Sequence, residues 1–301
     1  MAISRQQLAK ELEPGLNALF GLEYKNYENQ HGEIFDTETS DRAFEEEVML
    51  SGFGEAQVKS EGSAVSFDDA NESFTARYTH ETIALAFSIT EEAVEDNLYD
   101  SIAKRYTKAL ARSMAQTKQI KAANILNNAF ATTTYGDGQF LIDSDHPTVA
   151  AGDQSNLLAA SDLNETSLEA SLIAIGKFKD ERGFKIAARG MKLIIPSDLQ
   201  FVAERLTKTA NRVGTADNDI NAVQSMGMMP QGFVVNNFLT DTNAFFIKTD
   251  VPNGLKHFQR AALKTAMEGD FDTGNMRYKA RERYSFGASD WRGIFGSPGS
   301  S

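Results

Sequence analysis

The sequence contains no cysteine among its 301 residues. Disulfide bonds, thiol nucleophiles and thiolate metal sites are therefore excluded. No stretch reaches the roughly 18 consecutive apolar residues that a membrane helix requires. The N-terminal segment Met1–Gln6 also lacks the apolar core of a secretory signal. We therefore expect no membrane segment and no signal peptide.

Catalytic signatures are missing as well. The sequence has no Walker loop and no GxGxxG, GxSxG or HExxH motif. One loop, with Asp143, Asp145 and His146, could supply three metal ligands to a metal-dependent hydrolase. An acidic turn beside glycine and proline explains the same residues without a metal. We favour the turn, and predict no catalytic residue, no metal and no cofactor.

Basic residues are scarce in the first third of the chain. Residues 1–100 contain 22 acidic and 6 basic side chains, whereas residues 101–301 contain 20 acidic and 24 basic ones, for a net charge of -12. Sequence-specific nucleic-acid binding is disfavoured, because it needs a concentrated basic surface. The two halves could attract each other across subunits. A solvated acidic surface that aids solubility is the alternative.

The clearest positive feature is a polar two-stranded β-arm within residues 52–90. We predict one strand over Glu55–Phe67 and a turn at Asp68–Asn71. The alternation changes parity near His80, which predicts a bend between an exposed arm and a buried root. An isolated hairpin is marginal in water, so another copy of the chain would have to cover it; an ordinary surface hairpin is the alternative. The return strand places three apolar side chains on one face: Phe74, Ala76 and Tyr78.

A long helix is predicted directly after the arm, from Glu91 to Phe130, with Thr90 as its N-cap. No proline or glycine interrupts it. Its length of about 60 Å exceeds the diameter expected for a compact protein of this size, so the molecule should be flat or elongated. An apolar residue recurs every four positions on one stripe: Val94, Leu98, Ile102, Tyr106, Leu110 and Met114.

The remaining segments predict an α+β protein. The N-terminus should form a helix over Gln6–Glu13, broken at Pro14-Gly15, and could lie on a neighbouring subunit. Residues 131–162 are loop-rich, and the tail 296–301 is predicted to be disordered. Between them we predict helices at 164–182 and 199–210, a strand at 191–195, and a hairpin-like strand pair at 232–238 and 244–248.

The last long strand, Met276–Phe286, alternates strictly between apolar and basic residues. Its basic face could be a nucleic-acid strip, but neighbouring acidic residues favour a salt-bridged sheet face or a contact between subunits. The basic residues are Arg277, Lys279, Arg281 and Arg283.

Several segments, in this order, resemble the major capsid proteins of tailed bacteriophages, which have the Hong Kong 97 phage fold. They are Leu8–Phe20, Phe184–Leu206, which contains Lys192–Leu199 and is similar to a segment of Mu-type head subunits, Gly269–Gly274, Ala280–Tyr284 and Gly287–Gly293. The resemblance implies an N-terminal arm, an extended β-hairpin loop, a long spine helix, and peripheral and axial domains. The implied ranges are 1–34 for the arm, 51–85 for the loop, 35–50, 86–160 and 251–301 for the peripheral domain with its spine helix at 91–130, and 161–250 for the axial domain.

The resemblance further implies a structural, non-enzymatic protein whose pentamers and hexamers build an icosahedral head. The head would enclose phage double-stranded DNA without sequence-specific binding. Scaffolding, portal and decoration proteins are implied partners, with assembly in the host bacterial cytoplasm and a final place in the virion. An encapsulin-like nanocompartment shell and the metal-dependent hydrolase are the alternatives.

Exposure patterns suggest which residues make contacts between subunits. Some relatives form lysine–asparagine cross-links, but Lys59 is the single lysine of the arm and no acceptor is evident, so we predict no cross-link. The candidate contact residues are Phe53, Lys59, Phe67, Phe74, Arg77 and Tyr78 on the arm, and Arg277, Arg281 and Arg283 on the body.

Overall fold

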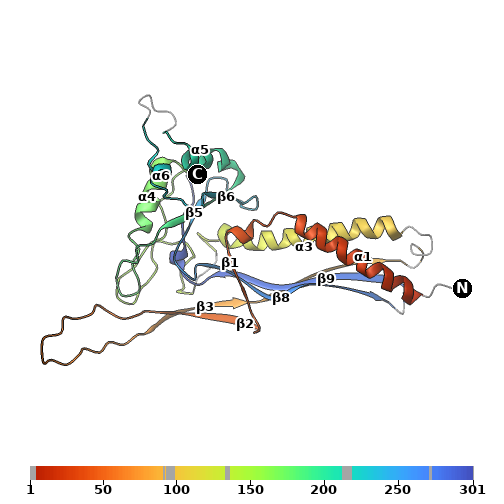
Figure 1. Ribbon diagram of the computed structural model, residues 1–301, viewed down its shortest axis with the longest axis horizontal. Coiled ribbons are helices and arrows are strands. Elements are labelled where there is room, and N and C mark those ends of the chain that lie inside the picture. The colour runs from red at the N-terminus through yellow and green to blue at the C-terminus, as the bar shows by residue number, and fades with distance from the viewer. Residues whose placement is uncertain are drawn as a thin grey trace.

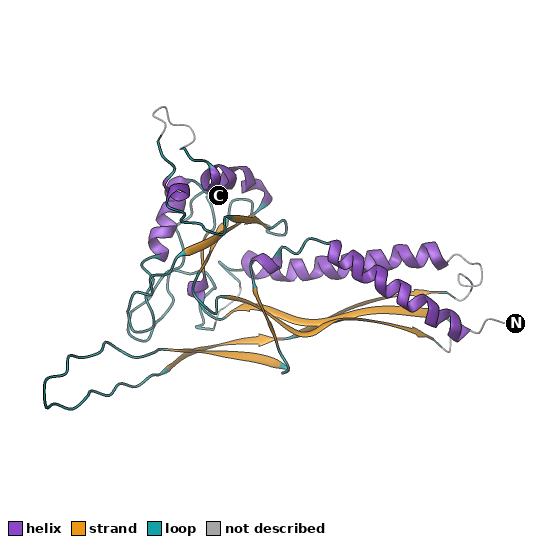
Figure 2. Ribbon diagram, viewed as in Figure 1, coloured by secondary structure: helices purple, strands orange, loops and turns teal. Residues whose placement is uncertain are grey.

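The computed structural model describes residues 5–90, 92, 99–132, 136–211, 219–270 and 273–300. The molecule has a long body, a second lobe beside one end of it, and a narrow loop that extends beyond both (Figure 1). Helices and strands are both abundant (Figure 2), which confirms the predicted α+β class. The elongated shape is also confirmed.

The body is built on a four-stranded sheet in the order β1-β8-β9-β4. β1 is parallel to β8, and the other two pairs are antiparallel. β8 has 15 residues, so it extends for about 50 Å at the rise of an extended strand. The bounds are β1 (Asp36–Thr39), β4 (Glu81–Ile89), β8 (Leu255–Gly269) and β9 (Met276–Ala288), the last confirming the predicted strand Met276–Phe286.

One face of this sheet is covered by α3 (Tyr99–Asn127), the described part of the predicted spine helix. Its 29 residues give a length of about 43 Å. Leu110 and Met114 of the predicted stripe are buried and belong to the same apolar cluster as Tyr278 of β9. The predicted start of the helix, residues 91 and 93–98, lies outside the described residues.

The N-terminal helix α1 (Arg5–Asn26) is continuous, and Pro14 lies inside it. The predicted break at Pro14-Gly15 is therefore wrong. An interior proline costs a helix about 3 kcal/mol, but Leu16 and Phe20 are buried in the cluster that α3 and the sheet share. This packing offsets the cost of the proline. α1 contacts α3 and β8 of its own chain, and a contact of this helix with a neighbouring subunit stays a prediction.

The second lobe contains a four-stranded sheet in the order β10-β7-β5-β6. The predicted hairpin at 232–238 and 244–248 is wrong, because β5 lies between these two strands and pairs with both. β5 confirms the predicted strand at 191–195. The bounds are β5 (Gly190–Ile195), β6 (Phe233–Val235), β7 (Phe245–Thr249) and β10 (Ile294–Ser297).

β10 corrects the prediction of a disordered tail at 296–301. It pairs with β7, and Asn156 fixes the neighbouring turn, since its Nδ2 donates to the carbonyl oxygens of Trp291 and Ile294 at 3.0 and 3.1 Å. The predicted peripheral range 251–301 therefore includes a strand of the second sheet. The predicted loop range 51–85 likewise includes β3, which pairs with β2 in a two-stranded sheet, and part of β4, which belongs to the body sheet.

Three helices cover the second lobe: α4 (Glu165–Ile175), α5 (Gln200–Lys208) and α6 (Ala222–Ser225). Asn164 caps α4 and exchanges hydrogen bonds with Ser167 in a capping box. α4 ends at Ile175, with Gly176 as its C-cap, rather than at residue 182, because the following residues form a turn that brings Phe178 back into the core. Short 3₁₀ turns occupy His31–Glu33, Ser197–Leu199 and Trp291–Gly293.

A buried polar cluster joins the spine helix to the sheet. Lys118 of α3 and Glu282 of β9 form an ion pair at 3.4 Å, with exposed side-chain fractions of 10% and 2%. The pKa of Glu282 is raised, because the effect of burial is larger than the opposite effect of the Lys118 charge. His31 and His257 contact each other beside this pair, with ring centroids 5.4 Å apart. Burial, and then the charge of Lys118, lowers the pKa of His31 to about 4 and that of His257 to about 3.

These histidines predict a loss of stability in mild acid. The unfolded chain takes up their protons near pH 6.5, whereas the folded chain takes them up near pH 4 and 3. The free energy of unfolding should therefore fall as the pH decreases from 6.5 to about 3, by on the order of 3 kcal/mol for each histidine. Urea unfolding at pH 7.5 and 4.5 checks this. A variant with His31→Gln and His257→Gln should lose less stability between these pH values, and an equal loss would contradict the prediction.

Pro14 should be replaceable with a gain in stability. Its side chain is exposed, so Pro14→Ala removes no packing and allows one more helical hydrogen bond. We expect the free energy of unfolding to rise by about 1–3 kcal/mol. The control is Pro196→Ala, which lies at a strand end and should not stabilise the chain. An unchanged melting temperature for Pro14→Ala would show that one more hydrogen bond at this position of α1 does not stabilise the protein.

Candidate self-assembly surfaces

The arm is a loop of residues 52–70 that projects from a two-stranded sheet of β2 (Phe44–Leu50) and β3 (Glu72–Thr79) (Figure 1). Its base is closed by two hydrogen bonds: the Ser51 amide donates to the Asn71 carbonyl at 2.8 Å, and the Asn71 amide donates to Ser51 Oγ at 3.0 Å. Beyond this clamp the chain forms no strand. The arm lies within the range, residues 52–90, that the sequence predicts.

The internal structure predicted for the arm is wrong. Residues 55–67 are not a strand, and the chain reverses at Ser60–Ser63, where the Ser63 amide donates to the Ser60 carbonyl at 3.2 Å, instead of at 68–71. The return strand β3 pairs with β2, which precedes the arm. β2 offers the better partner because it has its own alternation of half-buried and exposed residues, whereas residues 55–67 are polar and rich in small side chains.

The apolar side chains of the arm are almost fully exposed. Phe67 and Val58 are each 97% exposed, and Phe53 is 66% exposed. Lys59 is exposed as well. Several large apolar side chains exposed on one projecting loop are typical of an interaction site. The exposure that we predicted for Phe53, Lys59 and Phe67 is present, and their role as contact residues stays a prediction.

Phe74 and Tyr78 are not available as contact residues, which corrects that prediction. Phe74 is 9% exposed and belongs to the apolar core of the second lobe. Tyr78 is 3% exposed, its ring packs edge-on against Phe258 at 4.8 Å, and its hydroxyl is hydrogen-bonded with Ser289. The pairing of β3 with β2 turns this face toward the body, so the alternation marks a buried root rather than the arm.

Arg77 lies on the opposite face of β3. Its guanidinium is stacked over the ring of Phe44, 4.1 Å from the centroid, and is 3.7 Å from Glu46. Its side chain is 58% exposed, so both contacts leave it accessible. Arg77 therefore keeps its place among the predicted contact residues.

The root of the arm is tied to the second lobe by Glu181. This carboxylate is 2% exposed and accepts hydrogen bonds from Arg292 Nη2 at 2.7 Å, Ser73 Oγ at 3.1 Å and the Val149 amide at 3.3 Å. Ser73 lies in β3, two residues after the clamp. The arm therefore starts from a fixed base, and any movement of it begins beyond Ser51 and Asn71.

The predicted basic face of β9 is present. Arg277 and Arg281 are exposed, and Arg283 is half-buried. Arg277 pairs with Asp270 at 2.5 Å, and Arg283 Nη2 donates to the Ala43 carbonyl at 3.3 Å. These residues remain predicted contact residues of the body.

The predicted turn at Asp143–His146 is what the structure shows. The His146 ring is fully buried and stacks on Trp291, with centroids 4.5 Å apart. His146 Nδ1 lies 2.6 Å from Asp137 Oδ2 and Nε2 lies 3.1 Å from Asn156 Oδ1. Both ring nitrogens therefore face oxygen atoms of the chain at hydrogen-bond distance, and neither is directed at an open metal position. Among the described residues, no group of three potential ligands is placed to hold a metal ion.

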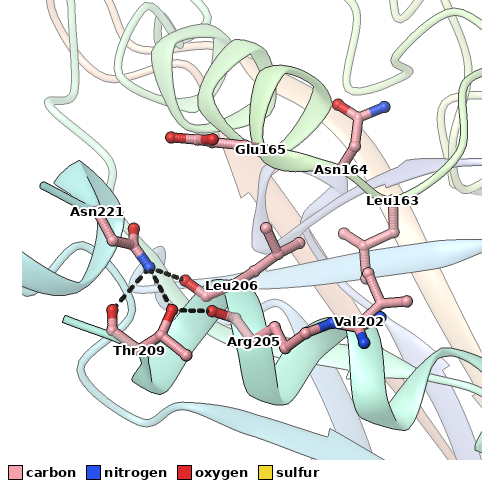
Figure 3. Close-up of a pocket in the computed structure, with 8 residues that line it drawn as sticks. All are labelled: Leu163, Asn164, Glu165, Val202, Arg205, Leu206, Thr209 and Asn221. Carbon is pink, nitrogen blue, oxygen red and sulfur yellow. Dashed lines mark hydrogen bonds between the residues drawn. The ribbon is translucent and has the colours of Figure 1, made fainter. Parts of the chain in front are cut away.

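A pocket of about 400 Å³ lies in the second lobe between the start of α4, α5 and Asn221 (Figure 3). Asn221 points into it but is used within the chain: its Nδ2 donates to the carbonyl oxygens of Leu206 and Thr209 at 2.8 and 3.0 Å. Its Oδ1 caps α6. The remaining lining combines Arg205 and Glu165 with aliphatic side chains, which is not the set of nucleophile, base and oriented partner that catalysis requires.

Comparison with known proteins identifies the chain. The family described as phage capsid protein matches residues 73–296. The chain belongs to this family. It is a structural capsid protein that forms the shell of a phage head, as the sequence resemblance implied. No curated protein matches it.

Solved structures confirm the Hong Kong 97 type of fold for this capsid protein. A virus-like particle from Pyrococcus furiosus is 13% identical, with a TM-score of 0.53 over 94% of this chain and 97% of that chain. The capsid of an empty GTA particle is 13% identical, with a TM-score of 0.55 over 90% of each chain. The capsid of Myoviridae phage XM1 is 8% identical, with a TM-score of 0.53 over 88% of each chain.

The second lobe of the capsid protein exposes further apolar side chains that the sequence analysis did not select. Phe201 is 74% exposed, Met226 is 71% exposed and Ile220 is 70% exposed. In α5, Val202 and Leu206 pack against the core, and Phe201 lies off that stripe. The sequence could have indicated the exposure of Phe201, because this apolar residue lies outside the buried stripe of a short helix.

No helix in the described ranges is long and apolar enough to span a bilayer.

Glu181→Gln should destabilise the capsid protein strongly. The substitution leaves the Arg292 guanidinium, which is 3% exposed, with one carboxylate partner, Asp290 at 3.3 Å. Breaking a buried ion pair costs about 3–5 kcal/mol, which thermal unfolding of the purified subunit would register. The control is Glu204→Gln, because Glu204 and Lys208 form a solvent-exposed pair that should contribute less than about 1 kcal/mol. Equal stability of the two variants would contradict the role assigned to Glu181.

Proposed function

We propose that copies of this capsid protein join in rings of five and six to build an icosahedral head around double-stranded DNA. One observation carries the proposal: the arm of residues 52–70 exposes large apolar side chains such as Val58 and Phe67, each 97% exposed. In a single subunit in water, these side chains are not buried and do not contribute to stability. A neighbouring copy that covers the arm would bury these side chains at about 25 cal/mol per Å² of apolar area.

The arm combines a fixed root with a loop that can change its conformation, so it can contact neighbours that are placed differently. Its root is fixed by the Ser51–Asn71 clamp and by Glu181, while Gly52, directly beyond the clamp, has φ +67°, a conformation that favours glycine. A loop without backbone pairing can adapt to the slightly different neighbours in a ring of five and a ring of six. The same subunit can then occupy both kinds of ring.

The charge of the chain fits a container for DNA. A net charge of -12 gives few phosphate contacts, so the genome would be held loosely and could be packed and released. The subunit would act as a structural component without catalytic activity. In this proposal, scaffolding, portal and decoration proteins are further partners, and shells assemble in the host bacterial cytoplasm before they become part of the virion.

The proposed contact residues fall into two sets. The arm contributes Phe53, Lys59 and Phe67, with Arg77 on the exposed face of its root. The body contributes Arg277, Arg281 and Arg283 from the exposed face of β9. All of them are accessible or partly accessible in the single subunit.

Shortening the arm tests the proposal. Deletion of residues 55–68 keeps the clamp and β3, so the subunit should keep its melting temperature but form no shells. Size-exclusion chromatography and negative-stain microscopy measure assembly, with the wild-type protein as the positive control. Intact particles from the shortened protein would disprove the role of the arm. Particles of the wild type that contain a protein cargo instead of DNA would favour the encapsulin-like alternative.

A further inference from the structure

The chain passes from the second lobe to the body sheet through a tight turn at Pro252 and Asn253. β7 ends at Thr249 and β8 begins at Leu255, so this turn lies on the covalent link between the two sheets. Asn253 has a φ of +60°, a positive value that the third position of a type II turn requires, and Pro252 suits the second position. Glycine and asparagine adopt this backbone conformation most readily, so the turn favours these two residue types at position 253.

The next residue has to be glycine for a different reason. A Cβ atom at Gly254 would lie 2.8 Å from Cα of Gly293, which is too close for any side chain, because the two backbones are in contact here. The Gly254 carbonyl also accepts a hydrogen bond from the Ser289 amide at 3.0 Å, beside the first pair of the β8–β9 ladder. Two separate requirements of the fold therefore place asparagine directly before glycine, and this is the single such pair in the sequence.

The two groups of this pair that could react with each other are both free. The Asn253 side chain is exposed. In the part of the chain that the structure describes, neither its carboxamide nor the Gly254 amide forms a hydrogen bond. Glycine also has no side chain that would shield its own amide nitrogen. Rotation of the Asn253 side chain can therefore bring Cγ against the Gly254 nitrogen, in the geometry that closes a five-membered succinimide ring.

We propose that Asn253 is a site of spontaneous deamidation through a succinimide. The Gly254 nitrogen loses its proton to hydroxide and attacks Cγ of Asn253. The new N–Cγ bond forms as the Cγ–Nδ2 bond breaks, and Nδ2 takes up a proton and leaves as ammonia. Water then opens the ring: addition at Cγ gives aspartate, and addition at the main-chain carbonyl gives isoaspartate. The net reaction consumes water alone, so it needs no enzyme, metal or oxidant.

The pair Asp137 and Gly138 could form the same ring but is held in place. The Asp137 side chain is 2% exposed, and its carboxylate lies 2.6 Å from His146 Nδ1. The carboxylate also accepts a hydrogen bond from the Gln139 amide at 3.0 Å. A carboxylate with both of these partners cannot turn toward the amide of Gly138. Exposure and free rotation thus distinguish Asn253 from a residue that has the same following neighbour.

The products change the link between the two lobes. Both replace a neutral amide with a carboxylate, and isoaspartate also adds a methylene group to the main chain. The added length falls directly before Gly254, where the backbone has no space beside Gly293. β8 would then start from a displaced position, so the modified subunit should be less stable than the intact one. The chain cannot reverse the reaction, and the protein would accumulate the change with age.

Peptide mapping tests the site. The purified protein is incubated at pH 8, and the tryptic peptide Thr249–Lys256 is followed by mass spectrometry and by labelling with an isoaspartate-specific methyltransferase. The internal control is Asn237, which is exposed like Asn253 but precedes Phe238, whose side chain hinders the attack. Asn253 should be converted about tenfold faster than Asn237, and more slowly at pH 6, because the attacking nitrogen must lose its proton. Equal rates at the two asparagines would overturn the inference.

A variant separates this reaction from other ageing of the protein. Asn253→Gly keeps a residue that accepts a positive φ and removes the carboxamide, so it should fold with the melting temperature of the wild type. After the same incubation, the wild type should contain a fraction that melts at lower temperature, and the variant should not. An equal loss in both proteins would contradict the effect on the link between the lobes. If the wild type reacts only when it is unfolded in urea, the folded turn protects Asn253 and the inference is wrong.

This inference and the proposed function fail separately. A subunit that forms no shells can still be modified at Asn253, which would overturn the proposed function alone. Shells that form normally and show no deamidation at Asn253 would overturn the inference alone.

Discussion

The architecture depends on the junction at His80, where the chain passes from β3 to β4. His80 is 5% exposed and lies between Ser40 and Ser285, with its Nε2 3.0 Å from Ser40 Oγ and its Nδ1 2.9 Å from Ser285 Oγ. Ser40 donates its own proton to Glu45 at 2.6 Å, so His80 Nε2 donates to Ser40 and Nδ1 accepts from Ser285. One neutral ring thus fixes the root of the arm to the body sheet.

This junction lets one stretch of chain serve two sheets. Before it, Phe74 of β3 points into the core of the second lobe, while Ala76 and Tyr78 pack against Phe258 of β8. After it, the apolar side chains of β4 pack in the cluster that α3 shares with the body sheet. The parity change gives each strand its own buried face. The arm can therefore project from the molecule while the long sheet keeps its helical cover.

Inside the body and the second lobe, buried charges are matched. Glu181 meets Arg292, Glu282 meets Lys118, and Lys256 lies between Glu38 and Glu47. Burial alone lowers the pKa of Lys256, but its hydrogen bonds to the two carboxylates outweigh burial and raise it. The arm and the open face of β9 differ, since their charges and apolar groups face solvent. The buried charges of the subunit thus have partners, whereas charges and apolar groups on two of its surfaces face solvent. A protein that assembles with copies of itself requires such accessible groups.

Local patterns in the sequence determined the long helix, the strand Met276–Phe286 with its basic face, the strand at 191–195 and the position of the arm. The helix and the strand Met276–Phe286 depend on periods of 3.6 and 2 residues, the strand at 191–195 on a short apolar run that ends at Pro196, and the position of the arm on its polar, turn-forming residues. The tertiary structure decided what distant segments do to one another. It pairs β3 with β2, places β5 between β6 and β7, keeps α1 continuous through Pro14 and brings β10 into the second sheet. Phe74 and Tyr78 are buried for the same reason: alternation shows that one face of a strand is apolar, but packing against the rest of the chain decides whether that face meets the core or another subunit.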